Sequence, residues 1–180
     1  MPKLVEVIIF GFFVCGSVAA NSSETNKPLE VGGKAPEFVL QDAADRTHAL
    51  KKLRGKVVVL ILGNRKIQKE DDKWAHAIQK NYQENSRITT FIIADMRSVP
   101  RFVPKALIKR QLKKNKPPVT LLLDWKGETH KAYRTQKEMP NLYVVNPDGK
   151  IAFHIKSNFS DEKYEKLKAV TEKEIAKIKT

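Results

Sequence analysis

Short apolar runs alternate with segments of helical periodicity along this chain. The runs Lys56–Leu62 (KVVVLIL) and Arg87–Asp95 (RITTFIIAD) are typical of strands that are buried on both faces of a sheet. Between them, a helix over Lys69–Tyr82 would gather its large apolar side chains on one arc and its charges on the opposite one; the arc holds Trp74, Ala75, Ile78 and Tyr82. This order predicts a strand–helix–strand unit with parallel strands.

The second half of the chain continues the alternation. A helix is predicted over Pro104–Lys114, because proline suits a first helical turn and an apolar stripe accompanies it: Val103, Leu107, Ile108 and Leu112. Three more strands are predicted, at Val119–Leu123, Asn141–Val145 and Lys150–His154. The turn sequence Asn146–Gly149 (NPDG) joins the last two as a hairpin, and Ser160 is the predicted N-cap of a final helix. The prediction is an α/β fold with a central mixed sheet flanked by helices.

The first twenty residues have the composition of a signal peptide. A short basic start at Lys3 precedes the apolar run Val7–Cys15, and small residues at Ser17–Ala20 form a cleavage site. We therefore expect a signal peptide over 1–20, a flexible polar lead-in over 21–30 and one domain over 31–180, exported to the periplasm or secreted. Retention of the apolar run as an anchor is the alternative, and a lipoprotein is disfavoured because Val14, not a small residue, precedes Cys15.

Cysteine usage excludes several kinds of chemistry. Cys15 is the single cysteine among 180 residues, and cleavage would remove it. The remaining chain has no intrachain disulfide, thiolate zinc site, cysteine-ligated iron–sulfur cluster or cysteine nucleophile. The four histidines are far apart and have no acidic or histidine neighbour at metal-site spacing, and no glycine-rich phosphate loop is present. We expect neither a metal nor a cofactor.

Four segments, in this order, resemble the redoxin branch of the thioredoxin-like superfamily, which includes AhpC/TSA peroxiredoxins and TlpA-like proteins; the overall pattern is also similar to YtfJ-type periplasmic proteins. The segments are Val31–Leu40 (VGGKAPEFVL), Leu50–Leu60, Val119–Tyr133 with Asp124, Gly127 and Tyr133, and Met139-Pro140 followed by Asn141–Ile151. The resemblance implies a thioredoxin-like fold over most of the chain. It also implies a cis peptide bond at Met139-Pro140, beside a substrate groove.

The chain departs from the family where the family's cysteines stand. Ile67 and Glu70 occupy the CxxC positions, or Lys66 and Lys69 if the register is one residue earlier. None of these side chains forms a thiolate, which thiol–disulfide exchange and thiol peroxidase chemistry require. Two interpretations stay open for this segment: an inert helix start, or a binding groove beside Pro140 with a new role.

Basic residues form the last notable pattern. The formal net charge is +14, from 34 Lys and Arg against 20 Asp and Glu, and 101–116 contains no acidic residue. Its predicted helix carries a candidate anion-binding surface, which consists of Lys105, Lys109, Arg110, Lys113 and Lys114. Within this surface, Lys105, Lys109 and Lys113 form one row. A solvated face that keeps the protein soluble is the alternative. Export and the excess of Lys over Arg argue against a nucleic-acid partner.

These observations favour an exported, non-catalytic thioredoxin-like protein that binds another protein or an anionic surface. An enzyme that uses the redoxin scaffold without thiols, with Glu70 or a histidine in a new role, is the alternative. A thiol oxidoreductase or peroxidase is not expected.

Overall fold

The computed structural model describes residues 29–178, so the predicted signal peptide and most of the predicted lead-in lie outside it. The strands of the described chain are β1 (Val39–Asp42), β2 (Thr47–Ala49), β3 (Val57–Asn64), β4 (Ile88–Asp95), β5 (Thr120–Asp124), β6 (Asn141–Val145) and β7 (Ile151–Lys156). The helices are α1 (Gln68–Tyr82), α2 (Lys105–Asn115), α3 (Glu128–Ala132) and α4 (Asp161–Ala176), with one 3-10 turn, η2 (Leu50–Leu53). No helix within these residues is long and apolar enough to cross a membrane.

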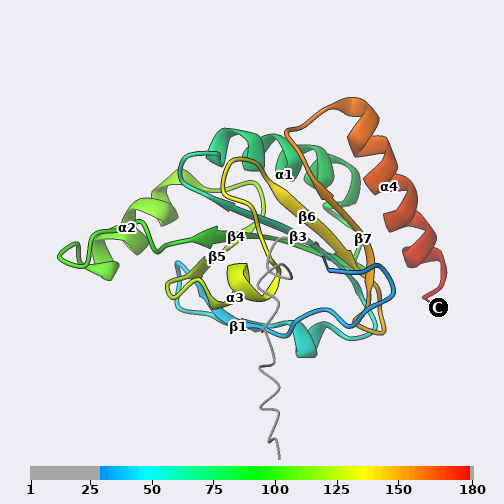
Figure 1. The fold of residues 1–180 in the computed structure, drawn as a ribbon, viewed down its shortest axis with the longest axis horizontal. Coiled ribbons are helices and arrows are strands. Elements are labelled where there is room, and N and C mark those ends of the chain that lie inside the picture. The colour runs from blue at the N-terminus through cyan, green and yellow to red at the C-terminus, as the bar shows by residue number, and fades with distance from the viewer. Residues whose placement is uncertain (1–28, 179–180) are drawn as a thin grey trace, which may run out of the picture.

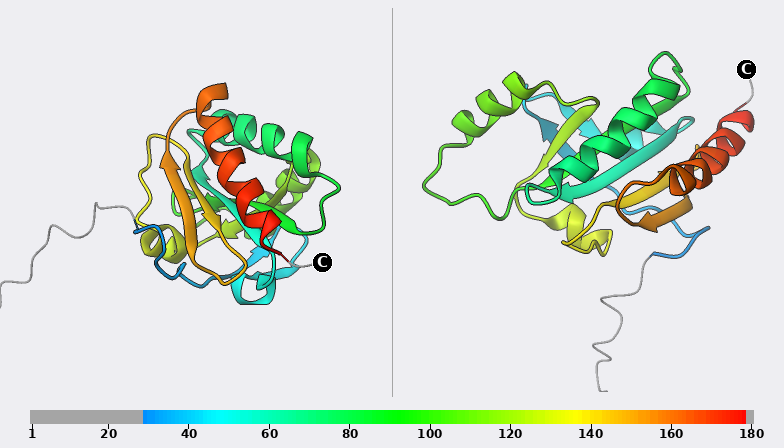
Figure 2. Two further views of the ribbon diagram at one scale, coloured as in Figure 1. Left: turned by 90° about the vertical axis from the view of Figure 1, so that its right-hand side faces the viewer. Right: turned by 90° about the horizontal axis from the view of Figure 1, so that it is seen from above.

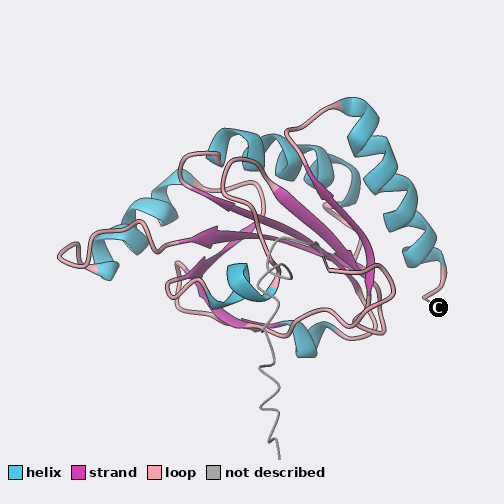
Figure 3. Cartoon of the chain, in the orientation of Figure 1, coloured by secondary structure: helices cyan, strands magenta, loops and turns pink. Residues whose placement is uncertain are grey.

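All the strands join one mixed sheet in the order β2-β1-β5-β4-β3-β6-β7 (Figure 3). The central strands β3, β4 and β5 are parallel, and β6 pairs antiparallel with β3. The parallel register pairs Asn64 with Asp95 and Asp95 with Asp124, so the three strands end side by side. This confirms the predicted α/β fold with a mixed sheet and places three polar residues at one edge of it.

The sheet is covered on both faces. Figure 1 shows α1 and α4 along its upper side and α3 with η2 along its lower side; Figure 2 shows α2 at one end of the molecule. Alternate residues of β3 enter the two cores: Val57, Val59 and Ile61 pack under α1 and α4, whereas Val58, Leu60 and Leu62 pack toward the opposite side. The continuous apolar run of β3 follows from this two-sided burial.

Several local predictions are confirmed. The predicted arc of α1 is buried, and Trp74 also donates a hydrogen bond from Nε1 to the Ser157 carbonyl (3.1 Å). The Asn146–Gly149 turn joins β6 to β7, with a hydrogen bond of 2.8 Å from the Gly149 N–H to the Asn146 carbonyl. The Ser160 hydroxyl accepts from the Lys163 N–H at the start of α4. Short-range sequence signals therefore located these elements.

Helix α2 packs more loosely than its apolar stripe predicts. None of its residues is fully buried, and Leu107 is 57% exposed. Ile108 and Leu112 face a cavity instead of a filled core. The short elements β1, β2 and α3 were not predicted: unlike the five-residue strands β5 and β6, none of them contains a run of consecutive apolar residues long enough to stand out in the sequence.

The expected cis bond at Met139-Pro140 is wrong: residues 29–178 contain no cis peptide bond, so this bond is trans. Trans is the default even before proline. The next residue, Asn141, is fully buried, and its side-chain Nδ2 donates to the carbonyls of Met139 (2.9 Å) and Gln136 (2.8 Å). The Met139 carbonyl is therefore occupied within the protein in the trans form.

Candidate functional site

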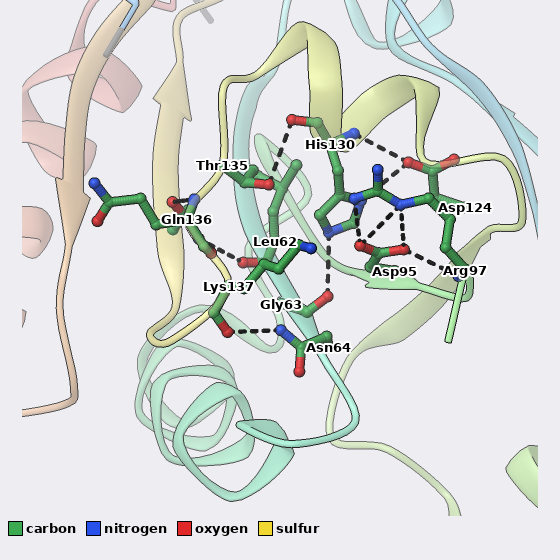
Figure 4. A network of polar contacts seen from close by, with 11 residues as sticks. Leu62, Gly63, Asn64, Asp95, Arg97, Asp124, His130, Thr135, Gln136 and Lys137 are labelled. Atoms are coloured by element: carbon green, nitrogen blue, oxygen red, sulfur yellow. Dashed lines mark hydrogen bonds and ion pairs between the residues drawn. The ribbon is translucent and has the colours of Figure 1, made fainter. Parts of the chain in front are cut away.

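The carboxyl ends of the three parallel strands meet at one edge of the sheet, which is the usual place for ligand sites in α/β folds. Asn64, Asp95 and Asp124 are the last residues of β3, β4 and β5. Around them lies a polar network that also includes His130 from α3 and Arg97 from the loop after β4 (Figure 4).

His130 is held inside the network. Its Nδ1 lies 3.0 Å from Asp124 Oδ2, and its Nε2 lies 3.1 Å from the Gly63 carbonyl oxygen. The His130 backbone N–H also donates to Asp124 Oδ2 (3.0 Å). Burial opposes ionisation of Asp124, but hydrogen bonds from the His130 side chain and backbone lower the pKa of that carboxyl. Because His130 is 4% exposed and both ring nitrogens face oxygen acceptors, the pair ties α3 to β3 and is not presented to a substrate.

A second ion pair joins the loop after β4 to the same edge. Arg97 Nη2 donates to Asp95 Oδ2 (2.6 Å), and Arg97 Nε lies 2.9 Å from Asp95 Oδ1. The guanidinium packs against Gly127, where a Cβ would lie 2.2 Å from Arg97 Nε. Gly127 also has a φ of +71° at the start of α3, which disfavours any other residue.

Ile67 and Glu70, the residues predicted to occupy the CxxC-equivalent positions, have structural contacts. Ile67 is half-buried, and its carbonyl accepts the first helical hydrogen bonds of α1 from Glu70 and Asp71. Glu70 accepts from Lys73 Nζ (2.5 Å) and from the Phe159 backbone N–H (3.1 Å), which links α1 to the loop before α4. These bonds, that of Lys73 first, lower the pKa of Glu70. The Glu70 side chain therefore connects α1 to the loop before α4.

The segment before β6 is fastened to the end of β3. Asn64 Nδ2 donates to the Lys137 carbonyl (2.8 Å), and Asn141 Nδ2 reaches the Leu62 carbonyl (3.3 Å). Pro140 is buried, and Met139 is half-buried. Neither residue lines the cavity described below, and the groove beside Pro140 stays a prediction.

A large cavity lies next to the end of β3, and Asn64 forms part of its wall. This cavity of about 550 Å³ separates α1 and α2 above β4 and β5. Asp71 of α1 lines it and is 3% exposed, yet its Oδ1 has no hydrogen-bond partner within the described chain. Burial, followed by the charges of Asp72 and Glu70, raises the pKa of Asp71 from 3.8 to about 8.

The close approach of α1 to β3 depends on a glycine. The Asp71 carboxyl lies over Gly63, where a Cβ would stand 1.9 Å from Oδ2 and 2.4 Å from Cγ. Gly63 therefore has two roles. Its lack of a side chain leaves room for the Asp71 carboxyl on one side of β3, and its carbonyl oxygen contacts His130 on the other side.

The five basic residues of the predicted anion-binding surface line one shallow hollow, together with Asp45, but they differ in their contacts. Lys109 is ion-paired to Asp45, and Lys105 Nζ lies 4.9 Å from the centre of the Trp125 ring. Arg110, Lys113 and Lys114 are exposed and have no ion-pair partner among residues 29–178. Lys105 and Lys109 thus each have a partner outside α2, whereas the side chains of Arg110, Lys113 and Lys114 extend into solvent.

The fold and this strand-end site define a thioredoxin-like α/β protein without the thiol site. The AhpC/TSA family model matches residues 31–154, and the chain belongs to the AhpC/TSA family. A putative thiol:disulfide interchange protein DsbE from Chlorobium tepidum superposes with a TM-score of 0.66 at 19% identity, over 82% of this chain and 99% of that one. A peroxiredoxin-like protein from Aquifex aeolicus gives 0.59 at 15% identity, over 81% and 90%. No curated protein matches the sequence.

Sequence reasoning missed most of this site. Asp124 and His130 are six positions apart, but Gly63 is 67 positions from His130, and only the sheet brings it to them. Asp71 was detectable, because it lies three residues before Trp74 and four before Ala75, on the buried arc of α1. Among the described residues, no group of three metal-ligating side chains could hold an ion.

Proposed function

We propose that this protein is an exported, thiol-independent accessory protein that attaches to an anionic membrane surface through α2. The redoxin scaffold is kept, but its reactive positions hold Ile67 and Glu70, which make packing and bracing contacts. The observation that carries the proposal is the outer face of α2, defined here as Ala106, Leu107, Arg110, Lys113 and Lys114, all of them exposed.

This outer face combines cations with apolar side chains. Leu107, Arg110 and Lys114 are spaced three and four residues apart, so they project from the same side of the helix. Phe102, in the turn before α2, is 86% exposed, and Leu107 is 57% exposed. Basic residues next to exposed large apolar ones are typical of helices that lie in a membrane interface. A purely solvated face would not require Phe102 and Leu107 on the surface.

The expected affinity is modest and depends on both kinds of residue. Each Lys or Arg near an anionic bilayer contributes about 1 kcal/mol, so Arg110, Lys113 and Lys114 together contribute about 3 kcal/mol. Insertion of the Phe102 and Leu107 side chains adds about 1.5–3 kcal/mol each if water is fully removed from them. Attachment would therefore be reversible and sensitive to salt.

Flotation with lipid vesicles tests the proposal. We expect the protein to float with vesicles that contain 30% phosphatidylglycerol and not with pure phosphatidylcholine. The Arg110/Lys113/Lys114→Glu variant should bind at least a hundredfold more weakly. Its matched control is Lys51/Lys52/Lys56→Glu, which changes the net charge equally at exposed positions around η2. Equal losses in both variants would mean that net charge alone drives binding and would refute the role of α2.

Two further measurements separate the alternatives. A Phe102→Ser/Leu107→Ser variant should lose vesicle binding but keep its retention on heparin, because heparin offers charge without an apolar phase. If heparin retention depends on Arg110, Lys113 and Lys114 and vesicle binding does not, the partner is an acidic polymer and the membrane proposal is wrong. Export is tested by the mass of the native protein, which should begin at Asn21.

A further inference from the structure

The cavity between α1 and α2 has the size of a small-ligand site. Its volume is about 550 Å³, within the range of pockets that hold small organic molecules. The walls toward α2 and the sheet are mostly apolar, with Gln111 and Asn115 of α2 as polar exceptions; the large apolar residues are Ile92, Val99, Val103, Ile108, Leu112 and Leu121. An unfilled apolar hollow of this size is uncommon in a close-packed core.

The opposite end of the cavity is polar and predominantly acidic. It is formed at the start of α1 and the ends of β3 and β4 by Asn64, Arg65, Gln68, Asp71, Asp72 and Asp95. Asp95 is already paired with Arg97, and Arg65 is the one basic residue among those that line this end of the cavity with Asp71 and Asp72. The acidic residues at this end of the cavity contrast with the chain as a whole, whose formal net charge is +14.

Asp71 is the feature that points to a ligand. Its side chain is buried at the cavity wall, and Oδ1 has no partner within the described chain. A buried carboxyl without a hydrogen bond is destabilising, and most such groups in folded proteins are satisfied. A donor that entered the cavity from the α2 side would supply the missing bond.

We propose that this cavity binds a small organic cation, specifically a primary ammonium carried on an apolar group of several carbons. The ammonium would donate to the Asp71 carboxylate, with Asp72 beside it, because three N–H donors on one nitrogen suit several oxygen acceptors. The apolar group would lie along Ile108, Leu112 and the neighbouring wall residues. The proposal is independent of membrane attachment, since the outer face of α2 does not line the cavity.

Binding would be coupled to a proton. Asp71 is mostly protonated near pH 7, because burial and the neighbouring carboxylates raise its pKa to about 8. An ammonium ion stabilises the carboxylate, so each bound amine should release close to one proton at pH 7. The titratable groups around Asp71 are Glu70 and Asp72 on its own helix, Arg65, Asp95 at the end of β4, and His130 behind Gly63. In the range below pH 7, the affinity for the amine should increase up to about tenfold for each unit by which the pH is raised.

Titration calorimetry with three probes of equal length tests the proposal: hexylamine, hexanol and hexanoate. We expect hexylamine to bind at least tenfold more tightly than hexanol, and hexanoate most weakly. The heat of hexylamine binding should differ between two buffers of unlike ionisation enthalpy by an amount that corresponds to the released proton. Asp71→Asn should weaken hexylamine at least tenfold, leave hexanol unchanged and abolish the buffer difference.

Two variants locate the site. Ala94→Phe fills the cavity from β4 and should abolish binding of hexylamine and hexanol alike, whereas Asp148→Asn, an exposed carboxylate in the β6–β7 turn, should change neither. Equal affinities for hexylamine and hexanol would show a merely apolar void and overturn the proposal. Hexylamine binding that survives Asp71→Asn, or no binding of any probe to the intact protein, would overturn it as well.

Discussion

Replacement of Asp71 by Asn changes the pH dependence of stability in a direction that the structure determines. The folded state raises the pKa of this carboxyl from 3.8 to about 8, so the folded protein holds a proton that the unfolded chain has lost over that interval. Stability therefore falls as pH rises between about 4 and 8, because ionisation is opposed only in the folded state. Asparagine keeps the shape of the side chain and cannot ionise.

The magnitude follows from the width of that interval. One pKa unit corresponds to 1.36 kcal/mol, and about three units have been crossed at pH 7, which gives about 4 kcal/mol as an upper bound. Entry of water beside the carboxylate would reduce the penalty, and we expect about 2–4 kcal/mol. This is a large fraction of the 5–15 kcal/mol that typically stabilises a domain. Asp71→Asn should thus be nearly neutral at pH 4 and clearly stabilising at pH 7.

Urea unfolding of both proteins at half-unit steps from pH 4 to pH 8 measures the effect. The difference in the free energy of unfolding between wild type and Asp71→Asn isolates the contribution of Asp71, because the other carboxyls titrate in both proteins. One of these is Asp42, whose burial is outweighed by hydrogen bonds from His48 and Arg46 that lower its pKa to about 2. Asp148→Asn provides the matched control with an exposed carboxylate. A difference between wild type and Asp71→Asn that stays within about 0.5 kcal/mol across the range would refute the argument.

Three other outcomes are expected. Gly63→Ala should destabilise the protein by about 1–3 kcal/mol, and less in the Asp71→Ala background, because the added Cβ collides with the Asp71 carboxyl; equal losses in both backgrounds in urea unfolding would contradict this. Asn141→Ala should cost about 2–4 kcal/mol of thermal or urea stability, since it leaves the Gln136 N–H and several carbonyls without their buried partner. Protein that begins at Asn21 should not catalyse insulin reduction or peroxide consumption, and turnover above a host-thioredoxin control would disprove that.

The order of elements was predictable from local patterns. The two-sided apolar run of β3, the buried arc of α1, the turn Asn146–Gly149 and the cap at Ser160 each depend on residues that are close in the sequence. Such signals repeat with the period of the element they form, which is why they survive without any knowledge of the fold. The lack of cysteine after Cys15 is likewise a property of the sequence alone.

The site depended on contacts that no local pattern encodes. His130 meets Gly63 across 67 positions because α3 follows β5, which shares a parallel sheet with β3. Asn64 meets Lys137 across 73 positions because β6, which follows Lys137, pairs antiparallel with β3. Whether Lys105 and Lys109 point outward was decided by Trp125 and Asp45, which lie on other elements. The trans bond before Pro140 and the unpartnered oxygen of Asp71 were decided in the same way, since burial and hydrogen bonding depend on which segments pack together in three dimensions and not on their spacing along the chain.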